Sequence, residues 1–144
     1  MQSWKNPMPE AGLTARRLEA LLDRIPYARW LGFSAVAEPD RVVAHLPFRE
    51  MLTGNPRLPA IHGGVVGAFL ELTALLELVG SPRDSAFARP INFNVNYLRS
   101  AGARDLWACA RVVKHGKRIA NVEVVGWQLQ EAKPVASGWA NFRL

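Results

Sequence analysis

The chain has very little cysteine and no long uncharged stretch. A single cysteine, Cys109, stands among 144 residues, so no internal disulfide can form, which is typical of a reducing compartment. The longest run without Lys, Arg, Asp or Glu is Leu58–Leu70, 13 residues, which is too short to span a bilayer. The N-terminal MQSWKNPMPEAGL has no apolar region of a secretory signal. These absences predict a cytoplasmic protein with no membrane partner.

Metal-binding patterns are also missing from the sequence. The chain has three histidines, His45, His62 and His115, and their spacing with one cysteine matches no metal-ligand pattern. We therefore expect no metal. With 49% hydrophobic and 21% charged residues, the composition predicts one packed domain over residues 1–144, in which residues 1–30 form an N-terminal helical segment.

Acidic residues are almost absent from residues 99–118. This segment holds six basic side chains against Asp105 alone, and so carries +5 of the net charge of +6. A polyanion would suit it, either a nucleic acid or the phosphates of a small ligand, although charge alone favours a solvated strand face. No RNA-binding motif is present, and about 30 residues with one good helix before the first strand are too few for a helix-turn-helix. We expect no nucleic-acid partner.

The apolar periodicity predicts an α+β domain. Leu18, Leu21, Leu22 and Ile25 predict a helix over 14–25 that Pro26 ends. Residues 65–79 are apolar on all sides and predict a buried helix of about 22 Å. Strand patterns occur before this helix, at 33–37 and 41–46, and after it, at 91–97, 104–114, 119–129 and 134–143. The last three strands are separated by short turns, which is typical of an antiparallel meander. The arrangement is a central helix wrapped by an antiparallel sheet.

One carboxylate, Glu71, interrupts the apolar helix. Its helical neighbours Gly67, Ala68, Ala74 and Leu75 include no base, so no local ion pair explains it. A buried carboxylate is costly and its pKa tends to rise. Glu71 is therefore a candidate catalytic group, or else it lies on a narrow exposed stripe or pairs with a distant Arg. Glu77, near the end of the helix, is expected to be solvated.

The triplet His62-Gly63-Gly64 precedes the same helix. Unpaired N–H groups and the helix dipole make a helix N-terminus suitable for an anion, or for a carbonyl oxygen becoming one. A merely flexible start of the helix is the alternative. Glu71 lies eight residues beyond Gly63, roughly 12 Å along the axis, whereas a reacting carbonyl needs both groups close by. If the two act together, the spacing predicts a symmetric dimer with two shared sites.

Several motifs together resemble a known family. They are a loop Asn, His-Gly-Gly at a helix start, an acid nine residues after the His, the strand end "NYLR" and the hairpin "RVVKHGKRIANVEV". From about Ile25 to the C-terminus, the chain resembles hotdog-fold thioesterases of the phenylacetyl-CoA / 4-hydroxybenzoyl-CoA type. The resemblance implies a long helix wrapped by a sheet, a dimer with its sheets joined edge to edge, often a tetramer, and hydrolysis of an acyl-CoA without any cofactor beyond the CoA of the substrate.

The resemblance also implies roles for particular residues. Gly63 matches the glycine whose N–H polarises the thioester carbonyl, and Glu71 matches the carboxylate that the partner subunit supplies as nucleophile or base. His62 matches the motif histidine, and Asn55 the polar residue of the substrate loop. The residues expected to bind substrate, mainly through the CoA phosphates, are Gly64, Arg99, Lys114, Lys117 and Arg118.

The chain departs from the family pattern beside the acid. Many relatives have Asp where this chain has Glu71. The branch that uses Glu places a hydroxyl four residues later, here Leu75, and the other branch places Ser or Thr on the next strand, here near Pro90. Thr73 lies about 200° round the helix from Glu71. The family pattern therefore assigns no residue of this chain to position the water, and the sequence does not identify the acyl group of the substrate. A hotdog hydratase or dehydratase and a non-catalytic acyl-CoA-binding module stay as alternatives.

Three further patterns concern the sheet. Asn92, Asn94 and Asn96 share one strand face, which we expect to be solvated, with a subunit contact as the alternative. Cys109 is expected to be an inert, packed thiol. The three tryptophans that recur along the strands are expected in the core or at an interface: Trp107, Trp127 and Trp139.

Overall fold

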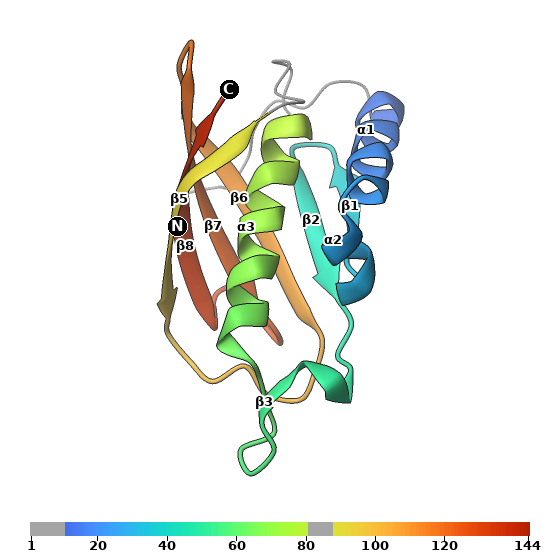
Figure 1. Cartoon of the computed structure of the whole chain (residues 1–144), viewed down its shortest axis with the longest axis vertical. Helices are drawn as coiled ribbons and strands as arrows, with labels where there is room; N and C mark the ends of the chain where they lie inside the picture. The colour runs from blue at the N-terminus through green and yellow to red at the C-terminus, as the bar shows by residue number, and fades with distance from the viewer. Residues whose placement is uncertain (1–10, 81–87) are drawn as a thin grey trace.

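The structure is a computed structural model that describes residues 11–80 and 88–144, with side chains from Ala15 onward. Two layers make up the fold: a long helix lies against one face of an antiparallel sheet, and two short helices flank it (Figure 1). The elements in chain order are α1 (Ala11–Asp23), α2 (Pro26–Leu31), β1 (Ser34–Glu38), β2 (Arg41–Leu46), η1 (Glu50–Leu52), β3 (Thr53–Asn55), β4 (Ala60–Ile61), α3 (Gly63–Gly80), β5 (Arg89–Tyr97), β6 (Leu106–His115), β7 (Ile119–Trp127) and β8 (Ala136–Arg143). This α+β arrangement confirms the predicted fold class.

The main sheet has six strands in the order β1-β2-β6-β7-β8-β5, every neighbouring pair antiparallel. The predicted meander is confirmed as β6, β7 and β8. A short turn joins β6 to β7, as expected, but the connection between β7 and β8 is longer than predicted and spans residues 128–135. β5 precedes the meander in sequence but pairs with β8, for example Val95 with Gly138. β5 therefore forms one edge of the sheet, and among the described residues its other side pairs with no strand.

The core lies between α3 and the sheet. Helix side chains such as Phe69 and Leu70 are fully buried, as are Ala108 and Val122 of the facing strands. Gly126 of β7 lets the helix approach, because a Cβ there would lie 2.9 Å from Leu70 Cδ2. By length and composition α3 could cross a membrane, but its apolar residues are explained by the sheet they pack against. The predicted helix at 65–79 is confirmed and begins two residues earlier.

The N-terminal helical segment differs in detail from the prediction. The expected helix at 14–25 is observed as α1, which ends at Asp23, followed by the separate helix α2. Pro26 begins α2, because proline's fixed φ suits the first helical position, where no N–H is needed. Gly32 ends it with φ 74°, a left-handed conformation that glycine adopts at little cost.

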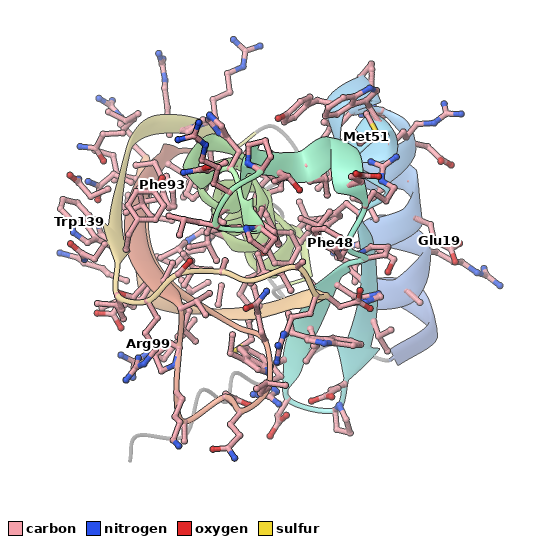
Figure 2. The ribbon with its side chains drawn as sticks, turned by 90° about the horizontal axis from the view of Figure 1, so that it is seen from below. Glu19, Phe48, Met51, Phe93, Arg99 and Trp139 are labelled. Atoms are coloured by element: carbon pink, nitrogen blue, oxygen red, sulfur yellow. The ribbon has the colours of Figure 1, made fainter. Side chains whose placement is uncertain are left out.

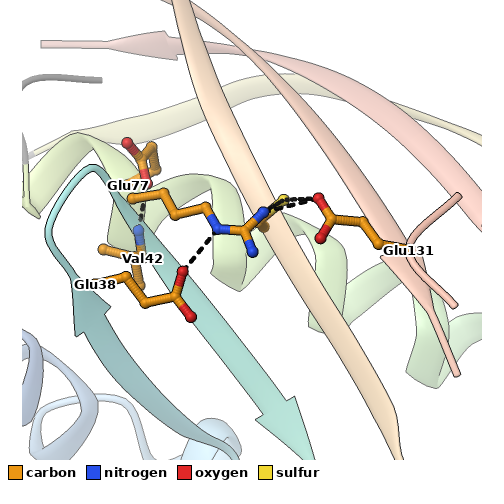
Figure 3. A network of polar contacts seen from close by, with 6 residues as sticks. Glu38, Val42, Glu77 and Glu131 are labelled. Atoms are coloured by element: carbon orange, nitrogen blue, oxygen red, sulfur yellow. Dashed lines mark hydrogen bonds and ion pairs between the residues drawn. The ribbon is translucent and has the colours of Figure 1, made fainter. Parts of the chain in front are cut away.

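The predicted solvation of Glu77 is wrong. Its side chain is fully buried and its Oε2 accepts the Val42 N–H at 3.2 Å, because β2 runs alongside the last turns of α3 (Figure 3). On the other side of β2, Arg41 bridges Glu38 at 2.9 Å and Glu131 at 2.7 Å. Glu77 is thus a structural carboxylate that joins the helix to the sheet.

On the outer face of the sheet, the structure agrees with the predictions for Cys109 and the asparagines of β5 but not with a core position for two of the tryptophans. Cys109 is fully buried beneath Arg41, and burial raises the pKa of its thiol to about 12, which confirms the inert, packed thiol. The three asparagines of β5 are exposed, as predicted, and Asn92 Oδ1 accepts from Asn141 Nδ2 at 2.8 Å. Trp139 points outward (Figure 2), and both it and Trp107 are exposed rather than in the core. Trp127 is half-buried. Their place at an interface stays a prediction.

Candidate active site

Gly63 is the first residue of α3, where backbone N–H groups lack helical partners. Val65 and Val66 both donate their N–H to the His62 carbonyl, at 3.0 and 3.1 Å. The Gly64 N–H donates to His62 Nδ1 at 2.9 Å. Among the described residues, no hydrogen bond takes up the N–H of Gly63. An amide donor is therefore available at the positive end of an 18-residue helix.

His62 holds this helix start in place. Because Nδ1 accepts from Gly64, the neutral imidazole carries its proton on Nε2. The His62 N–H donates to the Leu52 carbonyl at 2.8 Å, which ties the residue to the loop before it. Gly54 permits this approach, since a Cβ there would lie 2.8 Å from His62 Cα. The imidazole thus acts as a cap for the helix, and Gly54 is a site residue that the sequence analysis missed.

Tyr97 fixes the same turn from the sheet side. Its hydroxyl donates to the Gly63 carbonyl at 2.7 Å, and a Cβ on Gly63 would lie 3.4 Å from the phenol ring. Tyr97 stands in the "NYLR" motif, at the end of β5, but nothing in that motif alone indicated a contact with the helix. The hydrogen bond therefore fixes the peptide unit between Gly63 and Gly64.

A cleft of about 410 Å³ opens beside Gly63. Most of its lining side chains are apolar. They come from β4, the first turn of α3, the end of β5, the loop after it and the residue before β8: Ala60, Ile61, Gly63, Val66, Tyr97, Leu98, Arg99, Ser100, Ala101 and Val135. An apolar cleft with one backbone donor on its wall can hold an acyl group and polarise its carbonyl oxygen.

Glu71 does not line this cleft. It lies eight residues further along α3, on the partly exposed stripe that includes Ala68, Leu72 and Leu75. Among the described residues, no hydrogen bond or ion pair engages its carboxylate, and partial burial raises its pKa. One protomer therefore does not bring Gly63 and Glu71 together, in agreement with the spacing argument.

The family model for the acyl-CoA thioesterase N-terminal domain matches residues 55–143. The chain belongs to this thioesterase family. The match spans both the Gly63 helix start and the whole meander, so it includes every part of the cleft described above.

Solved structures support the hotdog thioesterase fold. A protein from Chromobacterium violaceum is 33% identical and covers 93% of this chain and 94% of its own, with a TM-score of 0.71. The E. coli PaaI protein from the phenylacetic acid degradation operon is 17% identical over 94% of this chain and 95% of its own, TM-score 0.80. Mouse thioesterase superfamily member 2 is 19% identical and covers 100% of this chain and 99% of its own, with a TM-score of 0.75. No curated protein matches the sequence.

The other predicted residues of this thioesterase domain divide into two groups: Asn55 and the hairpin cations lie apart from the Gly63 cleft, and Arg99 lines it. Asn55 is exposed on β3, and its Oδ1 accepts the Arg57 N–H at 3.0 Å, so it shapes the loop rather than lining the cleft. The three cations of the β6–β7 hairpin are exposed at the end of the protomer opposite Gly63 (Figure 1): Lys114, Lys117 and Arg118. Arg99 does line the cleft, and its Nη1 donates to the Pro134 carbonyl at 2.6 Å.

No hydroxyl lies in the expected position beside Glu71. Thr73 is buried and its Oγ1 donates to the Phe69 carbonyl at 2.8 Å, as is common for Thr in a helix. Leu75 and Pro90 have no hydroxyl. The described residues also include no cluster of three or more His, Cys, Asp or Glu that could hold a metal ion. The available chemistry is that of a carboxylate, a backbone amide and water.

Proposed function

We propose that the protein hydrolyses an acyl-CoA thioester to the free acid and CoA. The observation that carries the proposal is the N–H of Gly63, which no described residue accepts and which lies on the wall of an apolar cleft at the start of α3. In acyl transfer, negative charge develops on the carbonyl oxygen, and a preorganised donor at a helix N-terminus stabilises it. The peptide unit that carries this N–H is held through the His62 carbonyl, which accepts from Val65 and Val66, and Tyr97 holds the next peptide unit, so little reorganisation is needed during the reaction.

The catalytic carboxylate is Glu71 of a partner protomer. As general base, it removes a proton from water while the water oxygen attacks the carbonyl carbon of the thioester. The electron pair of the carbonyl moves to its oxygen, which the Gly63 N–H stabilises. When the tetrahedral intermediate collapses, the C–S bond breaks and the CoA thiolate takes the proton from Glu71. Alternatively, a Glu71 oxygen attacks the carbonyl carbon and the C–S bond breaks to release the CoA thiolate. Water then hydrolyses the resulting mixed anhydride, which restores Glu71 and supplies the proton that the thiolate takes up. The raised pKa of Glu71 favours a base role near neutral pH.

The shared site requires a homodimer, which could assemble further into a tetramer. Two features favour it. β5 is a long edge strand with a free side, and Ile91 and Tyr97 on it are more than half exposed, although exposed edges are normally covered. The stripe of α3 around Glu71 is only partly buried, with the small residues Gly67 and Ala68 beside it. Antiparallel joining of two β5 strands would place the two helices side by side.

The amide role is tested with Gly63→Pro and Gly63→Ala. Proline is favoured at the first helical position and removes only an N–H that the helix does not use. Alanine keeps the N–H and adds a Cβ in ordinary contact with Tyr97. We expect Gly63→Pro to lower kcat for acyl-CoA hydrolysis by roughly 10²–10³-fold, measured as thiol release. Gly63→Ala should retain most activity. Equal activity in the two variants would refute the role of the amide.

A further inference from the structure

A second cavity adjoins the Gly63 cleft. It has a volume of about 340 Å³ and shares Arg99, Ser100 and Val135 with the cleft. Its lining residues come from the loop after β5 and the connection between β7 and β8: Arg99, Ser100, Gly102, Arg104, Gln128, Leu129, Gln130, Lys133 and Val135. We call this cavity the basic chamber. We propose that it binds the phosphates of the nucleotide part of CoA, an inference that rests on the proposed function.

Charge is the first reason. Arg99, Arg104 and Lys133 line the basic chamber, and no acidic side chain does. Within the described part of the chain, none of these three cations forms an ion pair. Elsewhere on the sheet, Arg41 and Arg111 are each paired with a glutamate. A cavity lined by cations without any acid attracts anions, and Arg binds phosphate oxygens in bidentate geometry.

The second reason is that hydrogen bonds tie the walls of the chamber together. The N–H groups of Leu98 and Arg99 both donate to the Val135 carbonyl, at 2.8 and 3.0 Å. The Gln128 side chain accepts the Gly102 N–H at 3.0 Å and donates to the carbonyls of Gly102 and Arg104, at 2.9 and 3.0 Å. These bonds join the two wall segments across the chamber, so a ligand meets cations whose backbone is already ordered.

The third reason is the position of the chamber relative to the reacting carbonyl. With the thioester at Gly63, the pantetheine arm would follow the shared wall of Ser100 and Val135 and bring the phosphates to Arg104 and Lys133. Leu129, on the chamber's edge, is 77% exposed and offers an apolar surface to the adenine. The hairpin cations at 114–118, in contrast, lie at the far end of the same protomer.

The proposal is tested with the double variant Arg104→Glu/Lys133→Glu in the full chain. Its matched control is Arg16→Glu/Arg24→Glu, which makes the same charge change in and just after α1, on the side of the molecule away from Arg99 (Figure 2). We expect the chamber variant to raise KM for an acyl-CoA by about tenfold or more, because two charge-assisted contacts are lost. The control should leave KM within about twofold of the parent, since exposed charges this far apart are screened.

The same acyl group on pantetheine, which lacks the nucleotide, separates phosphate binding from damage to the cleft. We expect kcat/KM for acyl-pantetheine to be the same in the chamber variant and the parent. An unchanged KM for acyl-CoA, or an equal loss on both substrates, would overturn the proposal while leaving the proposed function intact. Arg104→Gln/Lys133→Gln, with half the charge change, gives the same comparison if the Glu variant does not fold.

Calorimetric titration with adenosine 3′,5′-bisphosphate makes the chamber testable without turnover. We expect the parent and the control to bind it and the chamber variant to bind at least tenfold more weakly. If the parent hydrolyses no thioester but the three proteins bind the bisphosphate as expected, the proposed function is wrong and the assignment of the chamber as a phosphate site is supported. If the parent does not bind the bisphosphate, the chamber assignment is wrong whatever the activity.

Discussion

At the scale of single residues, the two acids of α3 show what a sequence can and cannot say about a carboxylate in an apolar helix. Glu71 and Glu77 are six residues apart in similar apolar surroundings. Glu77 is fully buried, and the Val42 N–H donates to it, so it has a structural partner. Glu71 has no such partner among the described residues and its pKa is raised by burial. Only the tertiary structure separates the two, because the partner of Glu77 is 35 residues away in sequence.

Replacing Glu71 by Gln tests the residue that the sequence singled out. The change removes the base or nucleophile and keeps the size of the side chain, so we expect kcat for acyl-CoA hydrolysis to fall by about 10²-fold or more. Because the folded state raises the pKa of Glu71, the ionised carboxylate costs stability at neutral pH. We therefore expect the neutral Gln variant to have a higher Tm, seen by calorimetry, together with the lower activity.

The pH dependence follows from the same shift in the Glu71 pKa. The carboxylate must be ionised to act, so kcat/KM should fall as the pH drops through the raised pKa, which lies above the ordinary value of 4.5. Folding stability should change in the opposite direction to activity. The stability that protonated Glu71 contributes is lost as the pH rises through that pKa. A profile with no acid limb down to pH 4.5 in a folded protein would argue against Glu71 as the base.

At the scale of elements, the sequence was informative where apolar periodicity decides the structure. It predicted α3 and the meander, because their side chains pack against each other in a regular pattern. It did not place β5 beside β8, since that pairing depends on a chain crossing rather than on a local turn. It also did not reveal Tyr97 as a contact of Gly63, because the two residues are 34 positions apart. The basic chamber was missed for the same reason: its cations come from two segments far apart in sequence.

Gly138 of β8 tests how tightly β5 is held on the sheet. A Cβ at this position would lie 2.7 Å from the Asn94 carbonyl oxygen of β5 and 2.9 Å from the Phe93 ring. Backbone cannot yield as a flexible side chain does, so we expect Gly138→Ala to lower the free energy of unfolding by about 1–3 kcal/mol. Gly102→Ala is the control, as its Cβ would meet nothing closer than 3.9 Å. Denaturant titration of the two variants measures the difference, and equal stabilities would show that β5 adjusts freely.

At the scale of the whole molecule, the two groups of the proposed site lie apart in the described protomer. The Gly63 amide faces a cleft at one end of α3, and Glu71 lies eight residues along the helix, outside that cleft. A rise of roughly 12 Å separates them, which no side-chain rotation closes. The proposed dimer would solve this problem, since a two-fold axis would reverse the direction of the second helix and bring its middle toward the first cleft. The free edge of β5 provides the surface on which such an axis can form.

Mixed dimers test this arrangement directly. In a dimer of one Glu71→Gln protomer and one Gly63→Pro protomer, cross-subunit sites would pair both defects in one site and leave the other site entirely native. We expect the homodimer of each single variant to be nearly inactive. The mixed dimer, purified with two affinity tags, should recover about half of the native kcat per dimer. A mixture of the two variants kept from exchanging subunits is the control and should stay inactive. If the sites were instead complete within each protomer, every site of the mixed dimer would carry one defect and no activity would return.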